Sequence, residues 1–109
     1  MLEAARARLD RVDPAATRAA MDAGAMLLDI RSESQRERDG VVPGSTFIAR
    51  NVLEWRVEQM QGASSVIVMC DGGYQSSLAA ATLRDLGLDA TDLAGGFQPW
   101  REAGLPVAR

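Results

Sequence analysis

Residues 66–87, VIVMCDGGYQSSLAAATLRDLG, contain the only cysteine of the chain. The apolar run 65–69 predicts a strand that is buried on both faces, and residues 76–86 predict a helix that ends at Gly87. Cys70 therefore lies at the carboxyl end of a strand, just before a turn into a helix. Ligands bind at this end of the strands in open α/β sheets. A lone cysteine is commonly an inert buried residue, but this position favours a nucleophile.

Strand and helix patterns alternate along the rest of the chain. Strands are predicted at 25–30, 46–49 and 90–93, and helices at 13–24, 33–38, 52–60 and 97–104. Helix starts are predicted at Asp13 before Pro14, at Ser32 with Gln35, at Asn51 with Glu54, and at Ser76 with Ser77. This alternation predicts an α/β fold in which helices cover a mainly parallel sheet.

The composition is that of one globular domain. The 109 residues are 47% hydrophobic and 25% charged, with a net charge of −3, so we expect neither nucleic-acid nor membrane partners. No apolar stretch approaches the roughly 20 residues that span a bilayer, and the first ten residues lack the apolar core of a signal peptide. We therefore expect a cytoplasmic protein with one domain over residues 1–109, in which residues 1–12 form a peripheral extension.

The absence of histidine restricts the chemistry. With no histidine and one cysteine, one chain cannot build a Cys/His zinc site or a Ser-His-Asp or Cys-His catalytic group. We expect no metal and no cofactor. Any reaction at Cys70 must proceed without a histidine base.

The loop after Cys70 has the composition of an anion-binding turn. Gly72 and Gly73 allow the backbone to curl so that successive N–H groups point inward, and the following helix adds the positive end of its dipole. Such a cradle stabilises a thiolate or a persulfide, both of which are anions. The candidate loop residues are Asp71, Gly72, Gly73, Tyr74, Gln75 and Ser76.

Three segments resemble motifs of the rhodanese-like sulfurtransferase domains, and the similarity as a whole covers nearly the whole chain. Residues 27–45 are similar to the D-x-R strand end and the following proline–glycine turn of that family. Residues 66–87 resemble its active-site loop, and residues 93–107 resemble its closing G-G-x-x-x-W signature. The resemblance implies a single-domain, three-layer α/β/α fold around a five-stranded, mainly parallel sheet. It also implies that Cys70 is catalytic and carries a sulfane sulfur as a persulfide.

The implied reaction moves sulfur from a small donor to a thiophilic acceptor. The donor would be thiosulfate or a persulfide, and the acceptor a thiol, cyanide or the cysteine of a partner protein. Asp29 and Arg31 resemble the D-x-R pair of the family, for which we expect a structural ion pair. Arg50 ends a predicted strand, so it is a candidate for substrate contact at the same sheet edge as Cys70.

The loop departs from the family pattern in its charge. Asp71 follows the cysteine, and Gln75 lies near a position where the family often has arginine. Val41 stands where many members have a histidine. An inward-facing carboxylate would disfavour both a thiolate and a dianionic donor, so we expect weak activity with thiosulfate.

Two other functions remain open from the sequence. A non-catalytic interaction or regulatory module of the same fold is favoured by the loss of loop cations. A cysteine phosphatase would need arginine six residues after the cysteine to bind phosphate, and that residue is Ser76. Trp55 and Trp100 are predicted to pack in the core, whereas Tyr74 would lie at the loop tip, against a pocket or a partner.

Overall fold

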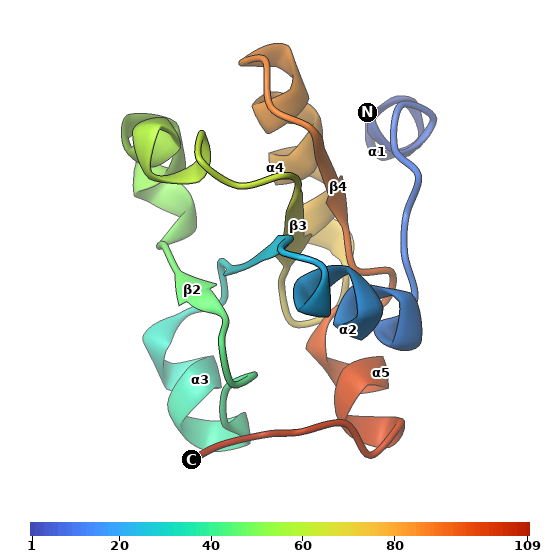
Figure 1. The fold of residues 1–109 in the computed structure, drawn as a ribbon, viewed down its shortest axis with the longest axis vertical. Helices are drawn as coiled ribbons and strands as arrows, with labels where there is room; N and C mark the ends of the chain where they lie inside the picture. The colour runs from blue at the N-terminus through green and yellow to red at the C-terminus, as the bar shows by residue number, and fades with distance from the viewer.

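In the computed structural model, which describes residues 1–53 and 55–109, one parallel sheet is flanked by helices (Figure 1). Its strands are β1 (Met26–Asp29), β2 (Thr46–Phe47), β3 (Val66–Met69) and β4 (Ala90–Asp92), in the order β2-β1-β3-β4. All three strand pairs are parallel, and Leu28 of β1 is in register with Val68 of β3. The predicted α/β class with a parallel sheet is therefore confirmed.

Six helices connect and cover these strands in the part of the chain that the structure describes. They are α1 (Leu2–Arg6), α2 (Pro14–Asp22), α3 (Glu33–Asp39), the 3-10 helix η1 (Arg50–Met60), α4 (Tyr74–Asp85) and α5 (Phe97–Glu102). Two predicted caps are present. The Asp13 side chain accepts a hydrogen bond from the backbone N–H of Ala16 at 2.8 Å, and Ser32 and Gln35 form a reciprocal capping box.

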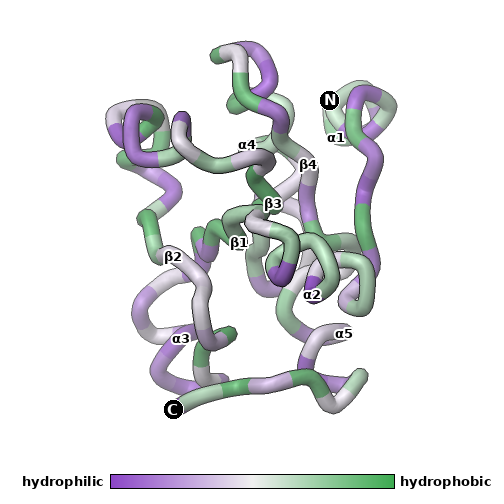
Figure 2. The backbone as a smooth tube through the Cα atoms, in the orientation of Figure 1, coloured by the Kyte–Doolittle hydropathy of each residue, from purple (hydrophilic) through white to green (hydrophobic). Residues whose placement is uncertain are grey.

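The core lies on both faces of the sheet, which explains why β3 is a continuous apolar run and why β1 is apolar up to Asp29. Successive side chains of a strand point to opposite faces, so Leu27 and Leu28 enter different clusters. Helix α4 covers the first face with Ala79, Ala80 and Leu83. Helix α5 covers the second with Phe97 and Trp100. Figure 2 shows the hydrophobic residues of β1 and β3 at the centre of the molecule.

The prediction of a five-stranded sheet is wrong. Beyond β4, the edge of the sheet has a single β-bridge, at Val12, where a fifth strand would pair. Val12 donates its N–H to the Asp92 carbonyl at 3.1 Å and accepts from the N–H of Ala94 at 2.8 Å. Pro14, which has no N–H, starts α2 two residues later. The extended segment therefore ends after one paired residue.

Two predicted helix starts are also wrong. Helix η1 follows Ala49, with no side-chain cap there, and Arg56 interrupts it with non-helical angles. The Glu54 half of the predicted capping box lies outside the described residues. Helix α4 begins at Tyr74 after Gly73, whose φ of +88° no other residue type adopts easily. Ser76 and Ser77 are therefore buried within its first turn instead of capping it.

The two tryptophans differ. Trp100 is 1% exposed and its indole N–H donates to the Pro106 carbonyl at 2.8 Å, as expected of a packing residue. Trp55 is 85% exposed, so its predicted place in the core is wrong, because the inward positions of η1 are occupied by Leu53 and Met60. Among residues 1–53 and 55–109, we find no helix with the length and apolar content needed to span a bilayer.

Candidate active site

The carboxyl end of β3 delivers Cys70 into a backbone cradle. Its Sγ accepts the N–H of Gly73 at 3.1 Å and the N–H of Ser76 at 3.3 Å, and the residue is 6% exposed. The left-handed conformation of Gly73 turns the chain sharply enough for both donors to face the sulfur. Two N–H groups at the start of α4 thus point at one sulfur atom, an arrangement that suits an anion.

A cavity of about 190 Å³ opens over the sulfur. It is lined by Ile30, Arg31, Gln35, Arg50, Cys70, Asp71, Gly72, Tyr74 and Gln75. The structure thus brings Arg50, from the start of η1, to the same cavity as the cysteine loop. Tyr74, which is 56% exposed, lines the same cavity.

Asp29 and Arg31 form a buried ion pair beneath this cavity. Arg31 Nη2 lies 3.0 Å from Asp29 Oδ2 and Nε lies 3.1 Å from Oδ1, and neither side chain is exposed. Arg31 also donates to the Gly40 carbonyl at 2.8 Å and stacks 4.0 Å from the centroid of the Phe97 ring. These contacts tie the end of β1 to the end of α3 and to α5, so the pair fixes one wall of the cavity.

The Asp71 carboxylate is turned toward α5. Its Oδ1 accepts a hydrogen bond from Gln98 Nε2 at 2.9 Å, and the residue is half-buried. Asp71 nevertheless lines the Cys70 cavity. A negative charge therefore stands at the cavity wall, although one of its oxygens is engaged away from the loop.

The turn at Gly95 and Gly96 packs against the backbone of the cysteine loop. A Cβ at Gly96 would lie 2.5 Å from both the Cys70 and the Asp71 carbonyl oxygens, and its φ is +75°. The next residue, Phe97, donates its N–H to the Cys70 carbonyl at 2.8 Å. The G-G pair in the sequence marks this segment, but only the structure shows that it packs against the loop.

A charged network behind the loop was not predicted. Asp92, which is fully buried, accepts the hydroxyls of Ser76 at 2.9 Å and Ser77 at 2.7 Å, and pairs with Arg11 at 2.9 Å. Arg6 donates to the Gly73 carbonyl at 3.0 Å. The signal in the sequence was an aspartate within a predicted strand, since buried carboxylates need partners. Its cationic partner, Arg11, is 81 residues away along the chain, a distance that no local pattern spans.

Comparison with known proteins agrees with this architecture. A family model for the rhodanese-like domain matches residues 13–103. The thiosulfate sulfurtransferase GlpE of Stutzerimonas stutzeri is 32% identical over 92 residues, which are 84% of this chain and 84% of that protein. A helix-turn-helix-type transcriptional regulator of Mycobacterium tuberculosis is 32% identical over 83 residues, which are 74% of this chain. The aligned part is only 36% of that regulator.

Solved structures give the same result. A protein of unknown function from Rhodopseudomonas palustris, described as a possible tyrosine phosphatase, aligns with a TM-score of 0.90 and 31% identity. The alignment covers 97% of this chain and 89% of that one. A rhodanese-related protein from Thermoplasma volcanium aligns with a TM-score of 0.80 and 27% identity, over 89% of this chain and 95% of the other. From the family match and these relatives together, the chain belongs to the rhodanese-like domain family.

Proposed function

We propose that this chain is a sulfurtransferase in which Cys70 is the nucleophile and carries sulfur as a persulfide. The observation that supports this most directly is the pair of N–H donors, from Gly73 and Ser76, that face the sulfur at 3.1 and 3.3 Å. Both the thiolate and the terminal sulfur of a persulfide carry negative charge, so the same cradle suits both states. The thiosulfate sulfurtransferase among the relatives also favours this function.

The proposed reaction has two steps. The Cys70 thiolate attacks the sulfane sulfur of thiosulfate, forming a new S–S bond, while the old S–S bond breaks and sulfite leaves with its electron pair. An acceptor such as cyanide then attacks the outer sulfur, and the Cys70 thiolate leaves as thiocyanate is released. Neither step requires proton transfer, so a chain without histidine can carry out both. Ping-pong kinetics are expected.

The cavity over Cys70 has room for a small sulfur donor and, in the second step, for a thiophilic acceptor. Arg50 lines the cavity with Cys70, and we assign it to binding the anionic part of the donor, because residues 71–76 of the loop contain no cationic side chain. Asp71, Gly72, Tyr74 and Gln75 would contact the donor from the loop side. A persulfide donor, a small thiol or a protein cysteine would fit the same chemistry. The reaction needs Cys70 as a free thiolate, and the cytoplasm keeps thiols reduced, so we propose that the chain acts there. We also propose that residues 1–109 form one domain.

Intact-mass spectrometry tests the proposal directly. After incubation with thiosulfate or a small persulfide and removal of excess donor, the chain should gain the mass of one sulfur atom. Dithiothreitol should remove that mass, and Cys70→Ala should never acquire it. If no donor adds sulfur to the wild-type chain, the proposal is wrong.

A non-catalytic regulatory module is the second candidate. One relative is a transcriptional regulator that is about three times as long as the matched segment, so this fold also occurs as part of a regulatory protein. The mass measurement separates the two functions. A module without chemistry would leave Cys70 unmodified by every donor, while retaining its folded structure.

Phosphatase activity toward aryl phosphates is expected to be absent, although one structural relative is described as a possible tyrosine phosphatase. Phosphate hydrolysis on a cysteine loop needs a guanidinium that binds the phosphate oxygens bidentately. The residue six positions after Cys70 is Ser76, whose hydroxyl instead donates to Asp92 at 2.9 Å. p-Nitrophenyl phosphate should give no rate above buffer, and a rate that disappears in Cys70→Ser would contradict this.

Neutralising Asp71 is expected to favour thiosulfate. Asp71→Asn keeps an oxygen that can accept from Gln98 but removes one negative charge from the wall of the cavity. The charge is partly exposed, so we expect about a threefold increase in kcat/KM for thiosulfate at low salt, and a smaller increase at high salt. Gln98→Ala, which changes no charge, is the control. An equal increase with a neutral persulfide donor would rule out the electrostatic cause.

A further inference from the structure

We propose that Arg6 and Arg11 are positioning residues that orient the two backbone donors of the Cys70 cradle. Both residues precede the family-model match, which begins at residue 13, and nothing in the sequence connects them with the cysteine loop. The inference rests on the proposed role of Cys70 as the reactive group. It does not depend on which donor or acceptor the protein uses.

Arg6 binds the loop at two points. Its Nη2 donates to the Gly73 carbonyl at 3.0 Å and its Nε donates to Ser77 Oγ at 3.0 Å. Within the part of the chain that the structure describes, Arg6 has no carboxylate partner. Its positive charge is therefore directed at the first turn of α4, close to the cradle.

Arg11 binds the same turn through Asp92. Its Nε and Nη2 donate to the two carboxylate oxygens of Asp92 at 2.9 and 3.2 Å, and Nη2 also lies 3.3 Å from the Gly73 carbonyl. Asp92 in turn accepts the Ser76 hydroxyl at 2.9 Å. Such charge-assisted, bidentate contacts restrain geometry more strongly than neutral hydrogen bonds.

The same two residues are held at both ends. Gly73 gives its N–H to the sulfur and its carbonyl to the two arginines. Ser76 gives its N–H to the sulfur and its hydroxyl to Asp92. The Gly73 carbonyl also accepts from Ser77 Oγ at 3.2 Å, and its backbone packs against Gly95. Because Gly73 is in the left-handed region and has no side chain, these backbone contacts, with those of the two arginines, restrain it there. The N–H groups of Gly73 and Ser76 are therefore already oriented toward the sulfur before the thiolate forms, so its formation requires no reorganisation of the loop.

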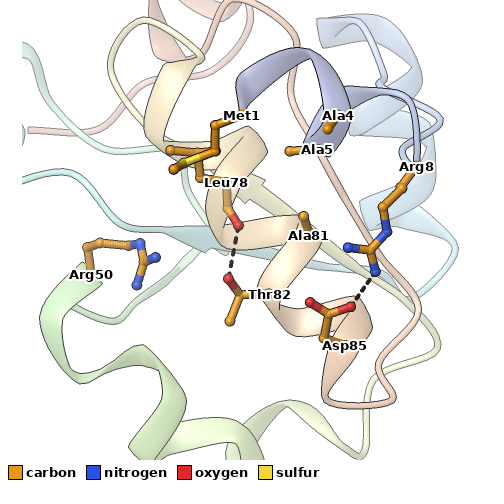
Figure 3. Close-up of a pocket in the computed structure, with 9 residues that line it drawn as sticks. All are labelled: Met1, Ala4, Ala5, Arg8, Arg50, Leu78, Ala81, Thr82 and Asp85. Atoms are coloured by element: carbon orange, nitrogen blue, oxygen red, sulfur yellow. Dashed lines mark hydrogen bonds and ion pairs between the residues drawn. The ribbon is translucent and has the colours of Figure 1, made fainter.

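Packing of the N-terminal segment can be separated from this role. Helix α1 lies against α4 (Figure 1), with Ala5 buried. Arg8 also links the segment to α4, through an exposed ion pair with Asp85 that Figure 3 shows at the edge of a groove between the two helices. Arg8 has no hydrogen bond to the cysteine loop among the described residues. Arg8 is therefore a matched control: it attaches the N-terminal segment to α4 but does not contact the Cys70 cradle.

The experiment measures alkylation of Cys70 by iodoacetamide in the full chain, which needs no sulfur donor. At neutral pH, Arg6→Gln is expected to slow alkylation about fivefold, while Arg8→Gln stays within 1.5-fold of wild type. Arg6→Lys, which keeps the charge and one donor, should recover at least half of the loss. At strongly alkaline pH the rates should converge, because the arginines act by favouring the thiolate. The titratable and charged side chains that line the cavity, Arg31, Arg50, Asp71 and Tyr74, are unchanged in these variants.

Arg11→Gln is the second variant, and it leaves the buried Asp92 without its cation, so thermal unfolding is measured in parallel. If Arg6→Gln and Arg8→Gln slow alkylation equally, the segment acts only by packing and the proposal is overturned. The same holds if Arg6→Lys behaves like Arg6→Gln. If alkylation responds as expected but no donor loads sulfur on the wild-type chain, the positioning role stands and the proposed sulfur transfer fails.

Discussion

Cys70→Ser is expected to abolish sulfur transfer and leave the fold intact. The hydroxyl is close to the thiol in size, and it can accept from the same N–H groups of Gly73 and Ser76. However, a serine hydroxyl without an adjacent base is a very weak nucleophile, and no histidine is available to act as that base. We expect a decrease in kcat/KM of at least about 100-fold, equivalent to about 2.7 kcal/mol in the activation free energy.

The measurement is thiocyanate formation from thiosulfate and cyanide, or from a persulfide donor where thiosulfate is too slow. Thermal unfolding of the variant within a few degrees of wild type would show that the loss is chemical. Arg8→Gln serves as the control, because its ion pair with Asp85 lies away from the sulfur. A variant that kept more than a few per cent of the wild-type rate would show that Cys70 is not the nucleophile.

Gly96→Ala is expected to lower the free energy of unfolding by about 3 kcal/mol or more. Its φ of +75° is strained for alanine, and the added Cβ would lie 2.5 Å from the carbonyl oxygens of Cys70 and Asp71. Real Cβ atoms do not approach oxygen this closely, so the backbone would have to move. The movement would displace the cysteine loop, and sulfur loading should fail along with stability.

Gly104→Ala is the comparison for a positive φ without the contact. Gly104 has a φ of +73°, close to that of Gly96, but a Cβ there would meet nothing within 4 Å. It should cost only the backbone strain, about 1 kcal/mol. Urea unfolding of both variants gives the comparison. Equal destabilisation by the two substitutions would mean that the contact with the cysteine loop contributes nothing.

Local sequence features determined the main elements and the place of Cys70. β3 is apolar at all four positions and β1 at its first three, a pattern typical of strands that are buried on both sides. The capping box at Ser32 and the proline after Asp13 act over one helical turn, so they can be read without the fold. Cys70 follows β3 directly, and the topology of parallel sheets then places it at the ligand-binding edge.

Contacts between distant segments were decided by the tertiary structure alone. The sheet edge at Val12 was reduced to one bridge, and Trp55 was left exposed because Leu53 and Met60 fill the inward positions. Most importantly, Arg6 and Arg11 reach the turn at Gly73 across 67 and 62 residues of sequence. Hydropathy and spacing describe the neighbours of a residue along the chain, whereas a charged network depends on which surfaces the packed core brings together.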